Sequence, residues 1–159
     1  MNLQFNSRFL LFLAFAVWVA PSARAATPQR RETSGVRYFA RQSVESGFAK
    51  DAYLYPAGES NFSIITARRD HGGDSELHAR DTDIFYVVDG SATFVTGGRM
   101  IGARQISPVE TRGSGVQGGK IWQLSKGDVI VIPAGTPHWF KQVSSTVRYF
   151  VVKVREDQK

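Results

Sequence analysis

Short runs of apolar residues, separated by turn residues, dominate the chain from residue 61 onwards. The run Val129–Ile132 is followed by Pro133 and Gly135, and the run Ile84–Val88 by an Asp-Gly pair. Proline ends ladder pairing and glycine permits a tight bend, so each run predicts one strand. The Asp-Gly pair also predicts a hairpin with the strand after it. The same pattern predicts five further strands, over Phe62–Arg68, Ala92–Thr96, Lys120–Leu124, His138–Lys141 and Thr146–Val154.

Many short strands with frequent turns predict an all-β sandwich or barrel, which we place at residues 61–154. Residues 26–60 are predicted to form a linker and arm. Within the arm, Val44 and Phe48 have helical spacing and predict a short helix inside Tyr38–Lys50. The segment Gly97–Gly119 is rich in glycine, serine and arginine and predicts an elaborated surface loop. Residues 155–159 are predicted to be a polar tail.

The first 25 residues have the order of a secretory signal peptide. Arg8 precedes the apolar run Phe9–Ala20, and a small-x-small cleavage signal follows at Ala23-Arg24-Ala25. The run is shorter than the roughly 20 apolar residues of a membrane-spanning helix. We therefore expect cleavage after Ala25 and an exported protein, periplasmic or secreted, without a stable membrane anchor.

The net charge and the absence of cysteine exclude some binding partners and some types of metal ligand. The formal net charge of +6 falls to +4 on cleavage, because residues 1–25 contain Arg8 and Arg24 and no acidic residue. The basic residues are scattered, whereas nucleic-acid binding normally shows a basic patch, so no nucleic-acid partner is expected. An anionic small molecule suits this balance better. The chain has no cysteine, which excludes disulfides and thiolate metal ligands.

The candidate functional residues include two of the three histidines in the chain. His78 and His138 lie beside apolar strands, and the carboxylates Glu76 and Asp83 flank the first of them. Glu76 and His78 are two residues apart, so on a strand they face the same side. A buried carboxylate is costly unless a cation or a proton accompanies it. Two imidazoles with one or two carboxylates suit one divalent transition metal, namely manganese, iron, zinc or nickel.

The residues around His138 resemble the second motif of the cupin family. The glycine, the proline, the second glycine and the histidine of that motif are matched here in order by Gly127, Pro133, Gly135 and His138, and Gln142 takes the place of the usual asparagine. The resemblance covers about Asn61–Val154. It implies a double-stranded β-helix, which is an antiparallel jelly-roll barrel, with a short N-terminal helical arm.

The first motif of the family, aligned back from Gly90, implies a metal site. It puts Asp83 at the acid position, His78 at the second histidine and Glu76 at the first histidine. The family more often has three histidines and a glutamate, so two carboxylates replace one histidine and the glutamate here. With a divalent ion, four such ligands would make a neutral site, which is a poorer Lewis acid than a cationic one.

Three arrangements of this site remain open at this point. All four residues bind the metal, or His78, Asp83 and His138 bind it while Glu76 serves as a general base, or the site holds no physiological metal. Phe85 and Phe140 share strand parity with Asp83 and His138, so they are predicted to wall the pocket.

The resemblance implies two classes of function. The first is a metal-dependent enzyme of isomerase, lyase or oxygenase type that acts on a small polar organic molecule. The second is a non-catalytic cupin that binds a small molecule or a metal. Cupins often dimerise through arms and sheet edges, so the resemblance also implies a homodimer. Fold alone does not decide between these functions.

Overall fold

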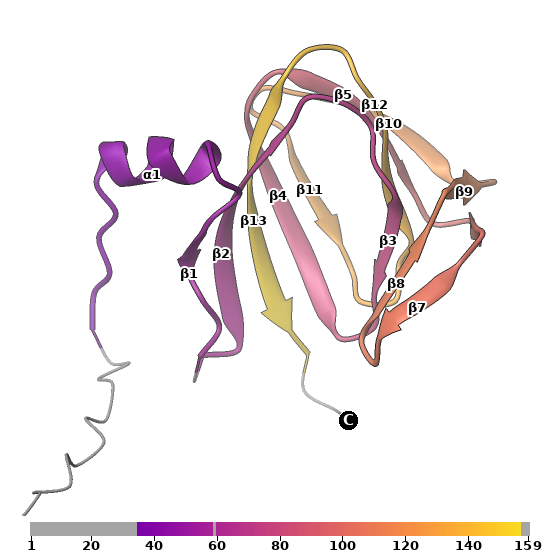
Figure 1. Cartoon of the computed structure of the whole chain (residues 1–159), viewed down its shortest axis with the longest axis horizontal. Coiled ribbons are helices and arrows are strands. Elements are labelled where there is room, and N and C mark those ends of the chain that lie inside the picture. The colour runs from indigo at the N-terminus through magenta and orange to yellow at the C-terminus, as the bar shows by residue number, and fades with distance from the viewer. Residues whose placement is uncertain (1–34, 59, 157–159) are drawn as a thin grey trace, which may run out of the picture. The chain divides into compact units, whose positions relative to one another are not determined.

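Two antiparallel sheets make up most of the computed structural model, which describes residues 35–58 and 60–156 (Figure 1). The five-stranded sheet has the order β1 (Tyr53–Tyr55), β2 (Phe62–Arg69), β13 (Val147–Arg155), β4 (Asp81–Asp89) and β11 (Val129–Ile132). The six-stranded sheet has the order β10 (Lys120–Ser125), β5 (Ser91–Thr96), β12 (His138–Val143), β3 (Ser75–His78), β8 (Glu110–Gly113) and β7 (Arg104–Ser107). The predicted all-β jelly-roll fold is confirmed. The strand β1 lies before residue 61 and adds part of the expected arm to the first sheet.

The core lies between the sheets and follows from the alternation of side chains along each strand. Its members on β4 and β13 recur at every second position, and those that are buried are Asp83, Phe85, Val87, Val147, Tyr149 and Val151. On the other sheet, the Phe94 ring is fully buried and its centroid lies 4.7 Å from that of Phe140. Aromatic side chains on both sheets thus contribute to one core cluster.

The arm contains the predicted helix as α1 (Arg41–Phe48). Phe48 is buried, and its ring centroid lies 5.1 Å from that of Phe150 on the outer face of the five-stranded sheet. A Cβ atom at Gly47 would lie 2.6 Å from Thr66 Oγ1 of β2. Gly47 weakens the intrinsic preference for a helix, but it permits this close approach of helix and sheet.

The predicted hairpin at Asp89-Gly90 is wrong. Gly90 has the positive φ of 80° that a tight turn favours, but β4 pairs with β13 and β11, while β5 pairs with β10 and β12. The turn therefore carries the chain from one sheet to the other. Asp-Gly encodes a sharp turn, whereas the pairing of the flanking strands depends on long-range contacts that a local pattern does not contain.

The segment Gly97–Gly119, predicted to be a surface loop, instead contains four short strands. Two of them, β6 (Arg99–Ile101) and β9 (Gly115–Gln117), pair with each other, and β8 pairs with β3 as well as β7. Each strand is only three or four residues long, so no alternation of useful length appears in the sequence. Pairing with β3 satisfies the backbone groups of this segment and makes it a neighbour of Glu76 and His78.

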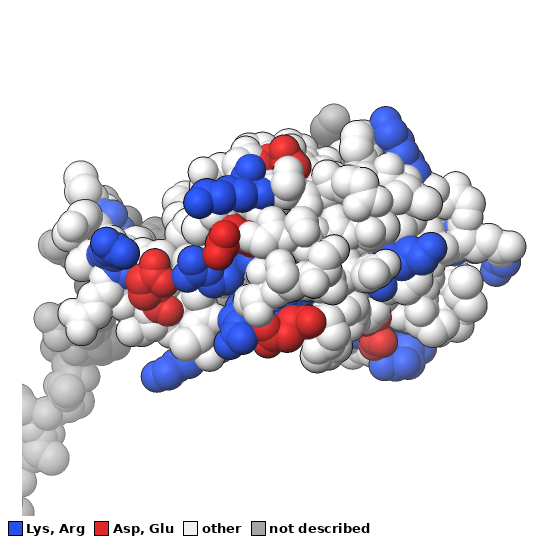
Figure 2. All heavy atoms as spheres, turned by 90° about the horizontal axis from the view of Figure 1, so that it is seen from above, with Lys and Arg blue, Asp and Glu red and all other residues white. Residues whose placement is uncertain are grey.

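The surface carries charges of both signs. On the face shown in Figure 2, lysine and arginine side chains lie among aspartate and glutamate side chains. Within the described ranges, α1 is the one helix and its eight residues are far too few to span a bilayer. The predicted signal peptide and most of the linker lie outside the described residues, as do residues 157–159.

Candidate functional site

Strand register brings the predicted site residues together from distant parts of the chain. Glu76 and His78 lie on β3, and Asp83 lies near the start of β4, after a short turn. His138 is the first residue of β12 and stands opposite Glu76 in the antiparallel pair. The turn before it is tied to β3, because the Gly135 backbone N–H donates to the His78 carbonyl over 2.8 Å. The Pro-Gly turn thus delivers His138 to the two residues on β3.

Three of the predicted residues form one compact cluster. Ligand atoms of Glu76, His78 and His138 all lie within 4.8 Å of one another. Glu76 Oε2 is 3.8 Å from His78 Nε2, and the two imidazole centroids are 5.2 Å apart. Two imidazole nitrogens and one carboxylate oxygen are the donor set of mononuclear transition-metal sites that keep open positions. This chemistry fits one divalent transition metal.

Both imidazoles have one ring nitrogen held by a neighbour. His138 Nδ1 lies 3.1 Å from the Thr136 carbonyl oxygen, and His78 Nδ1 lies 3.1 Å from Asp83 Oδ2. In the tautomers that donate from Nδ1, the lone pair that could bind a metal ion is on Nε2, as is usual when an outer group orients a ligating histidine. At His78 this Nε2 also lies 3.3 Å from Lys153 Nζ. Burial lowers the pKa of His138 despite the hydrogen bond with Thr136, which favours the neutral ring that binds metals.

Asp83 is paired with a residue that the sequence analysis did not single out. Asp83 is 1 % exposed, and its carboxylate accepts hydrogen bonds from Lys153 Nζ at 2.7 Å and 3.0 Å. Burial by itself would raise the pKa of Asp83, but the hydrogen bond from His78 and the Lys153 ammonium hold it below its ordinary value. Asp83 is thus an ionised group with a cation already beside it, and its assignment as a metal ligand stays a prediction.

The position of Lys153 follows from the alternation on β13. Val147, Tyr149 and Val151 point inward, and Lys153 continues that series directly opposite Asp83 on β4. Its Nζ also lies 3.2 Å and 3.3 Å from the two ring nitrogens of His78. The parity of the V-x-Y-x-V-x-K stretch was the signal that could have identified it.

Two arginines, also missed in the sequence, hold the other carboxylate. Arg69 Nη2 and Arg112 Nη1 lie 3.3 Å and 3.6 Å from Glu76 Oε1, so Oε2 is the oxygen that faces His78. Arg69 Nε donates to the Tyr149 hydroxyl over 2.9 Å. Burial, opposed by Arg69, raises the pKa of Tyr149 to about 12, so this phenol stays protonated. Glu76 is held in place by two guanidinium groups.

These groups border a small internal cavity of about 70 Å³. Its apolar wall includes Phe85 and Phe140, as the sequence analysis predicted, and their rings stack with centroids 6.0 Å apart. A water molecule takes about 30 Å³ of liquid volume, so the cavity has room for an ion with a small ligand.

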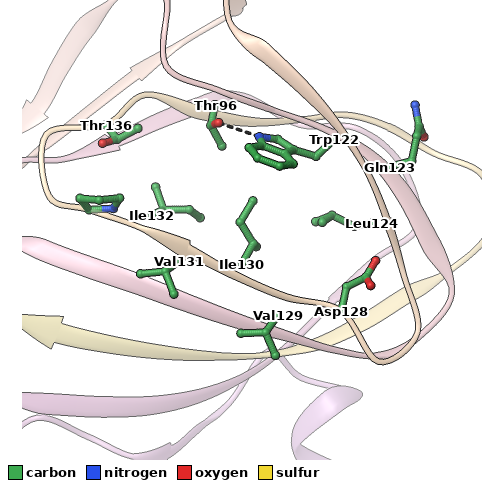
Figure 3. Close-up of a pocket in the computed structure, with 11 residues that line it drawn as sticks. Thr96, Trp122, Gln123, Leu124, Asp128, Val129, Ile130, Val131, Ile132 and Thr136 are labelled. Atoms are coloured by element: carbon green, nitrogen blue, oxygen red, sulfur yellow. Dashed lines mark hydrogen bonds between the residues drawn. The ribbon is translucent and has the colours of Figure 1, made fainter.

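A second, larger cavity of about 490 Å³ lies between the edge strands β10 and β11 (Figure 3). Trp122, Leu124, Ile130 and Ile132 give it a mostly apolar lining. Trp122 donates from its indole nitrogen to Thr96 Oγ1 over 2.8 Å. The Asp128 carboxylate accepts hydrogen bonds from the backbone N–H and the hydroxyl of Ser125. None of the described residues that line this cleft is a histidine.

Comparison with known proteins identifies the family. A family model with the description "Cupin" matches residues 51–159, which is more than half of the chain. No curated protein matches the sequence at a significant level.

A solved structure from Bacillus halodurans shows the same fold at low sequence identity. BH2720 from Bacillus halodurans is 15% identical with a TM-score of 0.51, over 79% of this chain and 87% of that chain. A predicted oxalate decarboxylase from Thermotoga maritima is 14% identical with a TM-score of 0.44, over 66% of this chain and 78% of that chain. The DMSP lyase DddQ from Ruegeria pomeroyi is 16% identical with a TM-score of 0.46, over 68% of this chain and 47% of that chain. At such identities the likeness concerns the fold.

Proposed function

The chain belongs to the cupin family, and from this premise we propose that it is a metal-dependent enzyme acting on a small anionic organic molecule. The observation that carries the proposal is the compact cluster of Glu76, His78 and His138 beside a cavity of about 70 Å³. Its chemistry is of isomerase, lyase or oxygenase type. Manganese, iron, zinc or nickel would serve as the ion.

The residues around the cluster have distinct tasks in this proposal. Glu76, His78 and His138 would hold the ion, which as a Lewis acid polarises a substrate oxygen. Thr136 and Asp83 orient the two imidazoles through their Nδ1 atoms. Phe85 and Phe140 exclude water from one side of the cavity, which strengthens electrostatic interactions inside it.

The preference for an anionic substrate follows from the charges near the cavity. The carboxylates near the cavity are matched by an equal number of cations. The carboxylates are those of Asp74, Glu76, Asp83 and Glu110, and the cations are Arg69, Arg104, Arg112 and Lys153. A bound divalent ion would therefore give the cluster a net positive charge. That differs from the neutral site expected from the four predicted ligands, and it favours substrates such as small carboxylates.

A second candidate function is the capture of an anion without catalysis. Arg69 and Lys153 support it, because both side chains line the cavity and can donate hydrogen bonds to an anion, although each is paired with a carboxylate. Such a protein would bind the same class of ligand with or without a metal.

We also propose that the protein is exported. The support is the signal-peptide pattern of residues 1–25. An intact mass of protein from an exporting host that begins at Ala26 supports this, and a mass that begins upstream of Ala23 contradicts it.

The test of the metal-dependent function starts from elemental analysis of purified protein. We expect about one equivalent of a single transition metal, its loss from the double variant His78→Ala/His138→Ala, and its retention in the matched control His71→Ala, because His71 is exposed on a bend away from the cluster. The loaded protein should then convert at least one of a panel of small carboxylates, and a chelator should abolish the reaction. Metal absent from the parent even after reconstitution would favour the anion-binding function.

A further inference from the structure

Lys153 occupies a position that matters for any metal bound in this barrel. Its ammonium lies between Asp83 and His78, at 2.7 Å from Asp83 Oδ1 and 3.2 Å from His78 Nδ1. Of these two neighbours, His78 belongs to the compact ligand cluster. Asp83 Oδ2 lies 3.1 Å from His78 Nδ1 and 3.7 Å from His138 Nε2, so Asp83 is close enough to compete for the same ion. A cation is thus built into the protein beside the place that the proposed metal ion would take.

The pairing with Lys153 engages both carboxylate oxygens of Asp83. Both oxygens accept hydrogen bonds from the same ammonium, and Oδ2 also lies 3.1 Å from His78 Nδ1. Lone pairs remain on the carboxylate, so it is the positive charge of Lys153, rather than a lack of acceptor sites, that disfavours coordination of a metal ion by Asp83. Breaking the pair to free it would also leave Lys153 without its anionic partner, which is costly in a site that is largely buried.

We infer that Lys153 is a built-in cation that keeps Asp83 out of the ligand set and weakens metal binding at this site. The inference rests on the proposed function, because it concerns the metal of the same cluster. It follows that this chain binds its ion through three protein ligands, with Asp83 acting as a positioning residue on His78.

Two physical effects both strengthen metal binding when Lys153 loses its charge. The repulsion between an ammonium and a divalent ion a few ångströms away disappears. Asp83 stays buried but loses its cationic partner, so its coordination to the ion becomes more favourable. Outer partners of metal ligands typically change metal affinity by about tenfold to a hundredfold, so we expect a gain of that size here.

The experiment measures the dissociation constants of Zn²⁺ and Mn²⁺ by competition with a chromophoric chelator, on the full chain after metal removal. The variant Lys153→Met keeps the length of the side chain and removes its charge, and it should bind at least one of these ions about tenfold to a hundredfold more tightly than the parent. Lys126→Met, in the exposed turn before β11, is the matched control and should bind as the parent does. Lys153→Gln, which still donates a hydrogen bond to Asp83, serves if Lys153→Met does not fold, and its affinity should change in the same direction.

The comparison of Asp83→Asn with the double variant Asp83→Asn/Lys153→Met tests the role assigned to Asp83. Removing the charge of Lys153 should give a smaller gain in affinity when Asp83 has already been replaced by asparagine than it gives in the parent, because the amide is a poor metal ligand. A gain of equal size in both backgrounds would overturn the part of the inference that concerns Asp83.

The outcomes separate the inference from the proposed function. Equal or weaker binding by the Lys153 variants, with a parent that does bind metal, overturns the inference and leaves the metal site standing. Binding by the variants alone supports the inference and contradicts metal dependence of the natural chain. Absence of binding from parent and variants overturns the proposed metal site and the inference together.

Discussion

The two cavities of this barrel differ in size and in the residues that line them. The larger one has fewer ionisable side chains. The cleft between β10 and β11 is about 490 Å³, and Asp128 is the one ionisable residue among the described residues that line it. The cavity beside His78 is about 70 Å³ and is bordered by several ionisable side chains, among them Arg69, Glu76, His78, Asp83, His138 and Lys153. Size alone would place a ligand in the cleft. The donor set, the oriented imidazoles and the buried charges support the small cavity as the proposed reaction site instead. Cavity volume and reactivity are therefore separate properties in this fold.

The largest expected difference between the cavities concerns metal affinity. His138→Ala removes a ligand of the compact cluster, and we expect at least a hundredfold loss, beyond the roughly tenfold to hundredfold effect of outer partners. Trp122→Ala, in the cleft, should leave the affinity unchanged. Equilibrium dialysis followed by elemental analysis measures both, and an equal loss in the two variants would contradict the separation.

The next difference concerns the carboxylates of the two cavities. Asp83→Ala leaves Lys153 without its partner and should lower the free energy of unfolding of metal-free protein by about 3 kcal/mol. Asp128→Ala, in the cleft, removes hydrogen bonds that are partly exposed to water and should cost only about 1 kcal/mol. Urea denaturation with a chelator present compares them. Equal losses of unfolding free energy in Asp83→Ala and Asp128→Ala would contradict this prediction.

A smaller effect is expected from the polar contact inside the cleft. Thr96→Val removes the acceptor of the Trp122 indole N–H and should cost about 1 kcal/mol of stability. The emission of the tryptophans should shift as the indole loses its partner, while metal affinity stays at the parent value. A change in metal affinity would show that the two cavities are coupled.

The smallest expected effect is a dependence of stability on pH. His138 has a pKa below its ordinary value of 6.5 in the folded protein, because burial disfavours the charged ring. The unfolded chain therefore takes up a proton first as the pH falls, so the contribution of the neutral ring is complete above pH 6.5 and is lost below it. Melting temperatures of metal-free protein between about pH 8 and pH 5 should fall less steeply for His138→Gln than for the parent. Equal slopes would contradict this role of His138.

The sequence predicted most strands because their patterns are local. The runs of β-branched residues in β11 and β13 and the Pro-Gly turn before His138 are visible without a partner strand. The pairing of β4 with β13 rather than β5 is not local, since it depends on which apolar faces meet in the folded barrel. The short strands between Gly97 and Gly119 form through pairing with β3 and with one another, which no stretch of three or four residues encodes.

The histidines and carboxylates of the candidate site were predicted from the sequence, but the cations beside them were not. Glu76, His78 and His138 were identified from strand parity and from the resemblance to cupins, and they form the compact cluster. The cations Lys153 and Arg69 were missed because charged residues on strands usually face solvent. Their long side chains reach the site from β13 and β2, so their contribution depends on the assembled barrel.

The most direct test of the central claim is a crystal structure of the metal-reconstituted protein with anomalous data collected at the edge of the bound metal. The account predicts one anomalous peak in the small cavity, within bonding distance of nitrogen atoms of His78 and His138 and of a Glu76 oxygen, with Asp83 still paired to Lys153. It predicts no peak in the cleft between β10 and β11. A peak elsewhere, or none near His78 and His138, would contradict the account.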